Sequence, residues 1–321
     1  MSETFALQET RCPKCSTTNV TANLYCKCCS NILEPRTDYW LQAQDFQTIA
    51  DKDALGLVKS TGVLPHLLNQ FLGKPRARKQ LEIISREGRS LNRFGNVNVL
   101  MRECAYTLCL ERLPAAHVIT GAGPPNAFTF GDDDAPIIVI DGRLVEGMRL
   151  DELRCVFGHE MGHIKSRHLL YHSLANMIAQ GVGISASFAG LNLISTPMRL
   201  ALLAWHRESE FSADRAALIA SGNPYHVASM LAMLGGISNR PISESTSLLE
   251  GIAHVFMSHP ILKERVNAVF RFSNSEEYSS IVRKSNYRRM LSNAFTPICQ
   301  FCGSPKAIEA IFCPECRKSQ A

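Results

Sequence analysis

Residues 151–165 read DELRCVFGHEMGHIK, and this stretch decides the fold of the chain. Asp151 stands where the N-cap of a helix is expected, and the acidic Glu152 follows it in the first turn. Apolar residues then recur at helical spacing: Leu153, Val156, Phe157, Met161 and Ile164. The stretch therefore predicts a helix that carries two histidines, His159 and His163, one turn apart.

The pattern His-Glu-x-x-His at residues 159–163 indicates metal chemistry. Side chains four residues apart lie on one face of a helix, so the imidazoles of His159 and His163 can bind one ion. Glu160 is one step round the helix and can reach a water molecule in the open position of that ion. A catalytic zinc site usually has three protein ligands, so a third ligand must come from elsewhere.

Residues 207–214, RESEFSAD, supply carboxylates within a second predicted helix, Met198–Ala220, which the sequence SGNP closes. Glu210 and Asp214 are four residues apart and face the same way. Glu210 can be the third ligand, and Asp214 can accept a hydrogen bond from the outer nitrogen of a ligand histidine. Alone, such an acidic cluster is more often a solvated helix face, but its pairing with the histidine motif favours a metal site.

The rest of the main domain reads as mostly helical with one group of short strands. Residues 36–112 have a helical pattern, and the pattern is again helical from residue 225 to about Phe295. Between them lie three strand-like runs separated by turn sequences: Ala116–Thr120, Asn126–Phe130 and Ile137–Ile140. This arrangement predicts an α+β fold with a small sheet.

The uncharged run 173–198 is long enough, at ~1.5 Å per residue, to cross a bilayer. Its polar residues make it a poor hydrocarbon segment, and metal ligands on both of its flanks require the chain to return to the same side. We therefore expect a buried or surface-lying helical hairpin, which is compatible with contact at a membrane surface. We expect His168 and His172 to continue the first helix as surface or hairpin residues.

Eight of the 12 cysteines form CxxC pairs, and the same spacing occurs at both ends of the chain. In each set ten residues separate the two pairs: Cys12, Cys15, Cys26 and Cys29 at the start, and Cys299, Cys302, Cys313 and Cys316 at the end. Tyr25 aligns with Phe312, and the spare thiol Cys28 aligns with Glu315. With no secretory signal in view, we read each set as a structural zinc ribbon rather than as disulfides.

Three uses of the ribbons remain open: a folding staple, a docking site for a protein partner or substrate, and a contact with nucleic acid. The formal net charge of +5 and the few basic residues in or beside the ribbons disfavour nucleic acid. The common spacing also allows the two ribbons to pack together.

Three blocks in this order resemble the HtpX-like zinc metallopeptidases, a family that includes CAAX prenyl proteases and OMA-type peptidases. The blocks are PNAFTFG…IIVIDGRLVEGMRLDELRCVFGHEMGHIKSRH, RESEFSADRAA and SHPILKERV, and the resemblance spans roughly residues 36–272. It implies a gluzincin fold, with a small sheet above the HExxH helix. It implies zinc ligands at His159, His163 and Glu210, with Glu160 as general base and acid and Asp214 orienting a histidine.

The resemblance also implies that a strand carrying Asn126, Ala127 and Phe128 pairs with extended substrate. The spacing of His259 leaves its role open, with a capping or core histidine as the default. The resemblance implies that it lies near the zinc, where it would stabilise the oxyanion or gate the site.

We therefore predict an N-terminal ribbon at 1–35, a metallopeptidase domain at 36–295 and a C-terminal ribbon at 296–321. The predicted activity is zinc-dependent endopeptidase cleavage of protein or peptide substrates, in protein quality control, with one catalytic and two structural Zn²⁺ ions. We expect a cytoplasmic protein able to lie at a membrane periphery. The alternative is a non-catalytic or latent zinc-ribbon protein that recruits protein or nucleic-acid partners.

Overall fold

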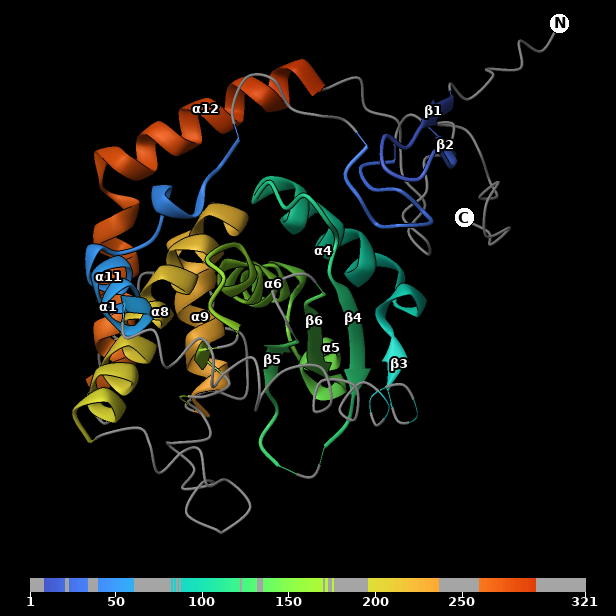
Figure 1. Cartoon of the computed structure of the whole chain (residues 1–321). Coiled ribbons are helices and arrows are strands. Elements are labelled where there is room, and N and C mark those ends of the chain that lie inside the picture. The colour runs from blue at the N-terminus through green and yellow to red at the C-terminus, as the bar shows by residue number, and fades with distance from the viewer. Residues whose placement is uncertain are drawn as a thin grey trace, which may run out of the picture.

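The fold is taken from a computed structural model of the whole chain (Figure 1). It describes residues 9–20, 23–33, 40–60, 82, 84, 86, 88–121, 123–131, 135–169, 171–172, 175, 196–236 and 260–292. His259, the C-terminal cysteine set and most of the run 173–198 lie outside these residues. Within them the protein is mostly helical with small sheets, which confirms the predicted α+β class.

The central element is helix α6, Leu150–Lys165, which carries the HExxH motif (Figure 1). It begins two residues earlier than predicted, because Arg149 rather than Asp151 is the N-cap. The carboxylate of Glu152 turns back and accepts the backbone N–H of Arg149 at 2.9 Å. A second acceptor bond, from the Ser229 hydroxyl at 2.6 Å, satisfies this fully buried side chain.

Helix α8, Thr196–Ser221, packs closely against α6. The contact is made where two glycines of α6 face alanines of α8. A Cβ atom on Gly158 would lie 2.7 Å from Cβ of Ala220, and one on Gly162 would lie 2.7 Å from Cβ of Ala216. Because only hydrogen fits at these two positions, the two helix backbones approach closely. This approach sets the distance between side chains that the two helices direct at each other.

A four-stranded sheet lies beside α6 in the order β3-β4-β6-β5 (Figure 1). Its strands are β3 Arg89–Ser90, β4 Ala115–Ile119, β5 Ala127–Phe130 and β6 Ile137–Asp141. Strand β4 runs parallel to β6, and β5 runs antiparallel to it. The three longer strands were predicted from the sequence with their ends displaced by at most one residue. Strand β5 is an edge strand and contacts α6.

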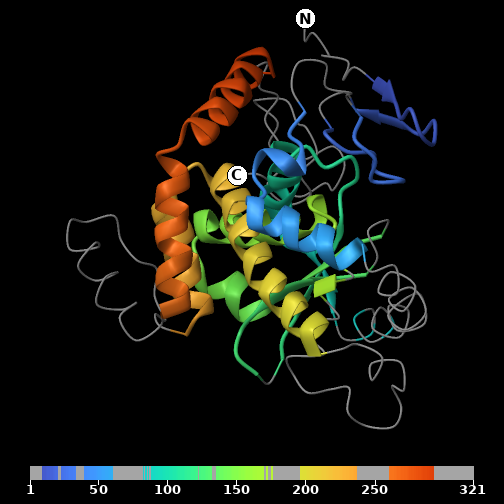
Figure 2. The ribbon, with the colours of Figure 1, turned by 60° about the vertical axis from the view of Figure 1, so that its left-hand side comes forward.

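The remaining helices enclose this centre. Helix α1 crosses α8, as Figure 2 shows, α4 packs on α6, and α11 packs on α8 and α9. Their bounds are α1 Ile49–Ser60, α4 Gly95–Thr107, α5 Gly142–Gly147, α9 Pro224–Leu234, α11 Pro260–Ser273 and α12 Glu276–Ser292, with short 3-10 turns at Ala43–Asp45 and Leu91–Arg93. No helix in the described ranges is both long enough and apolar enough to cross a bilayer.

The N-terminal cysteine segment, described at residues 9–20 and 23–33, forms a knuckle with two short paired strands, β1 Glu9–Arg11 and β2 Thr18–Val20. It is attached to the main domain rather than separate from it. Tyr25 is fully buried in the main core, and its hydroxyl donates to the carbonyl of Leu110 at 3.1 Å. Backbone bonds from Ile32 to Glu111 and from Leu113 to Ser30 extend the contact. Tyr25 therefore anchors the knuckle, which its alignment with Phe312 did not reveal.

Candidate active site

Three side chains from α6 and α8 converge on one point. Nε2 of His159 and Nε2 of His163 are 3.3 Å apart. The two carboxylate oxygens of Glu210 lie 3.5 Å from these nitrogens, one oxygen to each. A tetrahedral zinc with bonds of 2.0–2.1 Å has ligand atoms separated by roughly 3.3–3.4 Å. The residues present therefore fit a zinc ion in size, in geometry and in donor type.

The three side chains line a cavity of about 360 Å³ beneath the edge strand β5. Glu160 lines the same cavity and is buried. One of its oxygens, Oε2, accepts the hydroxyl proton of Thr129 at 2.6 Å. Burial raises the pKa of Glu160 above its ordinary value, although the nearby His159 opposes the shift. A carboxylate with a raised pKa is suited to accept and return a proton near neutral pH.

The outer nitrogen of His159 meets a carboxylate directly. Nδ1 of His159 lies 3.0 Å from Oδ1 of Asp214, which is almost completely buried. Arg265, on α11, donates to both oxygens of Asp214 at 2.7 Å and lies 3.1 Å from Glu210. Although burial opposes ionisation, this guanidinium lowers the pKa of Asp214 and of Glu210. Arg265 is a site residue that the sequence analysis missed, although it stands within the block SHPILKERV.

The outer nitrogen of His163 meets a second histidine. Nδ1 of His163 is 3.3 Å from Nδ1 of His168, and Nε2 of His168 is 3.3 Å from Oδ2 of Asp51. The expectation that His168 continues the helix at the surface is wrong. Helix α6 ends at Lys165, Arg167 adopts a left-handed conformation at φ 55°, and the chain folds back so that His168 is fully buried.

His172 and His206 are further residues of the cavity lining that the sequence analysis did not place there. His172 is mostly buried, so its expected position at the surface is also wrong. Its ring centroid is 4.2 Å from that of His163 and 4.2 Å from that of His206. Burial lowers the pKa of both His172 and His206, which keeps both rings neutral at pH 7.

Comparison of the sequence with known proteins identifies the family of the chain. The sequence profile described as Peptidase family M48 matches residues 92–272, more than half of the chain. The chain belongs to peptidase family M48. M48 enzymes are zinc metallopeptidases, so the predicted resemblance and enzyme class are confirmed. Asp51 lies before the first residue that the M48 profile matches.

Individual M48 relatives are distant. The chain is 27% identical over 272 residues to the plastoglobule-localized metallopeptidase 48 of Arabidopsis thaliana, a match that covers 77% of each protein. It is 26% identical to a Protease HtpX homolog of Janthinobacterium and 28% identical to one of Campylobacter concisus. These two matches cover 46% of this chain but only 62% and 59% of the bacterial proteins. No solved structure gives a significant match.

The predicted substrate strand borders the M48 site. Asn126, Ala127 and Phe128 all line the cavity, and the carbonyl of Asn126 accepts the backbone N–H of Asp141 from β6 at 2.9 Å. Within the described residues, β5 pairs only with β6, so its other edge is available for a further strand. The aromatic ring of Phe128 is partly exposed beside that edge.

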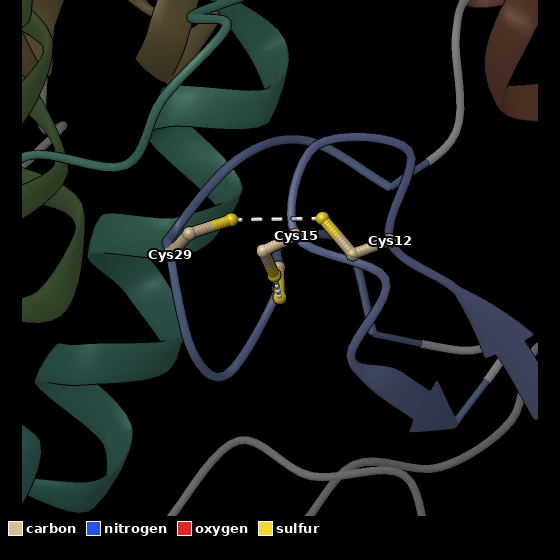
Figure 3. A group of neighbouring side chains, drawn as sticks. Cys12, Cys15 and Cys29 are labelled. Atoms are coloured by element: carbon tan, nitrogen blue, oxygen red, sulfur yellow. Dashed lines mark hydrogen bonds between the residues drawn. The ribbon is translucent and has the colours of Figure 1, made fainter.

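The N-terminal cysteines form a second cluster of candidate ligands (Figure 3). Sγ of Cys12 is 3.5 Å from Sγ of Cys29, and Sγ of Cys15 is 3.6 Å from Sγ of Cys26. Zn–S bonds of 2.3 Å place tetrahedral sulfur atoms roughly 3.8 Å apart, so the four thiols also fit zinc. Cys28 is exposed and is not part of this cluster, as its alignment predicted.

Proposed function

We propose that the chain is a zinc metalloendopeptidase in which His159, His163 and Glu210 hold the catalytic ion and Glu160 is the general base. The observation that carries this proposal is the convergence of these ligand atoms: the two Nε2 atoms are 3.3 Å apart, and each lies 3.5 Å from one carboxylate oxygen of Glu210. Its position beneath an edge strand, in a cavity that contains Glu160, supports a catalytic rather than a structural ion.

The chemistry divides between the ion and the protein. Zinc in such a site supplies Lewis acidity, which lowers the pKa of a bound water to roughly 7 and polarises a carbonyl. Glu160 takes the proton of the attacking water and afterwards delivers it to the leaving amine. Because Thr129 donates to Oε2, the other oxygen of Glu160 is the one that carries the proton. Asp214, held by Arg265, keeps the ring of His159 oriented with its outer nitrogen protonated.

The substrate is proposed to bind as an added strand on β5. Within the described residues the edge of β5 away from β6 is unpaired, and Asn126, Ala127 and Phe128 at this strand line the cavity next to the histidines and Glu160. Recognition through the backbone accepts many sequences, as expected of an enzyme that removes unfolded chains in quality control. For His259, stabilisation of the oxyanion or gating of the site stays a prediction.

The cysteine cluster of the knuckle is proposed to hold a structural zinc, and the repeated spacing predicts a second one at Cys299, Cys302, Cys313 and Cys316. The burial of Tyr25 in the main core supports the folding-staple role for the N-terminal ribbon. The domain limits 1–35, 36–295 and 296–321 remain predictions. The printed name of the plant relative refers to plastoglobules, which is consistent with the proposed ability of this chain to lie at a lipid surface.

The non-catalytic alternative is less favoured by the geometry. It predicts an occluded cleft or a Glu210 that faces away from the two histidines. Instead, the carboxylate of Glu210 faces both rings, and the site opens into a cavity of about 360 Å³.

The decisive experiment is Glu160→Gln, assayed on an unfolded protein substrate such as reduced casein. We expect hydrolysis to fall by about 10²–10⁴-fold, the usual contribution of a general base, with all zinc retained. The matched control is Glu146→Gln, on the exposed face of α5, which should leave activity unchanged. An active Glu160→Gln protein would falsify the assignment.

Zinc counting by mass spectrometry tests the metal assignment separately from catalysis. We expect three zinc ions per chain, one catalytic and two structural. A count of two or fewer would show that one of the three sites is misread.

A further inference from the structure

We propose that Asp51 and His168 are positioning residues that set the metal-binding tautomer of His163. The inference rests on the proposed function, because it takes His163 as a zinc ligand. It assigns a role at the metal centre to helix α1, which has no residue among the candidate ligands.

The direction of each hydrogen bond in this chain of residues follows from which ring nitrogen meets the metal. Nε2 of His163 faces His159 and Glu210, so it must be unprotonated to bind an ion. Its Nδ1 then carries the hydrogen and donates to Nδ1 of His168 at 3.3 Å. Nδ1 of His168 is thereby the acceptor, so the hydrogen of this neutral ring is on Nε2 and is donated to Asp51 at 3.3 Å.

Asp51 fixes the direction of the last hydrogen bond in this series, because its ionised carboxylate can only accept. This side chain is fully buried, its Oδ1 accepts the indole N–H of Trp205 at 2.9 Å, and its Oδ2 accepts the hydroxyl of Ser212 at 2.6 Å. Ser212 directs its hydrogen at Asp51 because an ionised carboxylate can only accept, while the hydroxyl oxygen accepts the backbone N–H of Thr48 at 3.0 Å. A carboxylate with these donors stays ionised, and burial is tolerated because each oxygen is satisfied.

The side-chain amide of Gln47 lies next to His168 and Asp51, so its hydrogen bonds must be compatible with these tautomers. The amide nitrogen of Gln47 lies 3.3 Å from Nε2 of His168 and 3.4 Å from Oδ2 of Asp51. Since this nitrogen and Nε2–H of His168 are both donors, the amide hydrogens belong to the bond with Asp51. Both donors then converge on the same carboxylate oxygen.

The opposite tautomer would prevent metal binding. If Nε2 of His168 lost its hydrogen, its lone pair would face the carboxylate of Asp51 at 3.3 Å with no proton between them. Nδ1 of His168 would then carry the hydrogen and donate to His163, whose own hydrogen would move to Nε2. A histidine protonated at Nε2 has no lone pair there for the ion. Asp51 therefore excludes this state by charge.

An Asp51→Asn substitution should invert the tautomers with little change in shape. The indole N–H of Trp205 needs an acceptor, so it holds the amide oxygen of the new side chain at the position of Oδ1. The amide NH₂ group then takes the position of Oδ2 and donates to Nε2 of His168. This inversion is the same kind of tautomer error that disables a serine protease when its buried aspartate becomes asparagine. We expect metal affinity to fall by about 10–100-fold, the usual loss for outer-shell partners.

Two substitutions at His168 separate this role from simple packing. In His168→Asn the amide oxygen stands close to the position of Nδ1 and can still accept from His163, so metal affinity should stay within about threefold of wild type. In His168→Gln the polar atoms stand close to the position of Nε2, so the contact with Asp51 is retained but the acceptor for His163 is lost. We expect His168→Gln to bind metal about 10-fold or more weakly than His168→Asn.

The experiment is a Co²⁺ titration of the full chain with all variants in the Glu160→Gln background, so that binding is measured without turnover. Cobalt at the histidine–carboxylate site gives visible bands without the thiolate charge-transfer absorption of the cysteine sites. We expect the Glu160→Gln parent and its His168→Asn variant to bind cobalt most tightly. The His168→Gln and Asp51→Asn variants should bind it more weakly. In the zinc-loaded protein with wild-type residues at 51 and 168, ¹⁵N-histidine spectra should show hydrogen on Nδ1 of His163 and on Nε2 of His168.

Equal weakening by His168→Asn and His168→Gln would overturn the proposal, as would an Asp51→Asn protein that binds cobalt as tightly as its parent. Circular dichroism of each variant shows whether weaker binding is caused by unfolding. The ¹⁵N-histidine spectra test the tautomers directly, in a protein that keeps Asp51 and His168. If the parent itself shows no cobalt band from the histidine–carboxylate site, the proposed metal centre fails. The proposed roles of Asp51 and His168 then fail with it. If instead the parent binds cobalt at this site and the variants bind it equally well, the metal centre stands and only the roles of Asp51 and His168 fail.

Discussion

The knuckle cysteines and the histidine–carboxylate site are both arranged for zinc, but they are built in different ways. Cys12 and Cys29, the most widely separated of the four thiols, are 17 residues apart in one short segment. In the second site, His159 and Asp214 are 55 residues apart, and Asp51 and Ser212, which support it from α1 and α8, are 161 residues apart. The first cluster needs only local loops, whereas the second exists only when several helices pack.

The charge balance of the two clusters differs as well. Cys12, Cys26 and Cys29 pack in a small cluster of their own with Leu33, and the proposed zinc ion would neutralise the thiolates. At the catalytic site Arg265 already neutralises much of the charge of Glu210 and Asp214 before any metal binds. The fold therefore supplies a counter-charge for the histidine–carboxylate site, while the knuckle is proposed to depend on its metal. The comparison predicts different responses to substitution.

The largest expected effect on stability is that of Arg265→Met. Removing this largely buried guanidinium leaves the buried Asp214 and the partly exposed Glu210 without their arginine, so the zinc-free protein should lose about 3–5 kcal/mol of unfolding free energy. Added zinc should restore part of the loss, because it binds the native state and replaces the missing charge. Urea denaturation with and without zinc measures both quantities.

The control for this prediction is Arg271→Met, on an exposed position of the same helix α11, which should change stability by less than about 0.5 kcal/mol. If the zinc-free Arg265→Met protein were as stable as wild type, the view that Arg265 is the fixed counter-charge of the site would be wrong.

An intermediate effect is expected from Gly162→Ala. The new Cβ would lie 2.7 Å from Cβ of Ala216, so α6 and α8 must move apart, at a cost of about 1–3 kcal/mol. Because His163 and Glu210 are on opposite sides of this contact, zinc affinity should fall as well. Thermal denaturation and cobalt binding measure the two effects. Gly147→Ala, where no atom lies within 4 Å of the new Cβ, is the matched control and should cause neither.

The smallest effect on the main domain is expected from Cys29→Ser. This protein should lose one zinc per chain and exchange the amide hydrogens of residues 9–33 faster, because a zinc of its own is proposed to hold the knuckle together. The amides of α6 and α8 should exchange at the wild-type rate. Cys28→Ser, one residue away but outside the cluster, should retain all zinc. Faster exchange throughout α6 would show that the two sites are not independent.

Several elements could be predicted because their signals are local. The HExxH helix, the paired Glu210 and Asp214, and the three longer strands follow from periodicity, motif spacing and turn sequences. The four N-terminal cysteines and the exclusion of Cys28 follow from the repeat at the two ends of the chain. In each case the residues that meet are near in sequence or are linked by a recognisable motif.

Other residues could not be predicted because their partners are set by packing alone. Arg265 shows no local sign that it meets Asp214, and His168 departs from helical spacing only because Arg167 reverses the chain. Asp51 stands in a helix with nothing to mark it as an acceptor for a histidine more than 100 residues later.

The sequence by itself therefore determined which atoms are available to bind metal, since ligand type and helical spacing are covalent properties of the chain. The tertiary structure decided which groups face each ring nitrogen, from which we propose the position of each hydrogen, and how the buried charges are balanced. Those properties depend on the groups that face each ring across helix contacts, and low solvent access makes each such contact decisive.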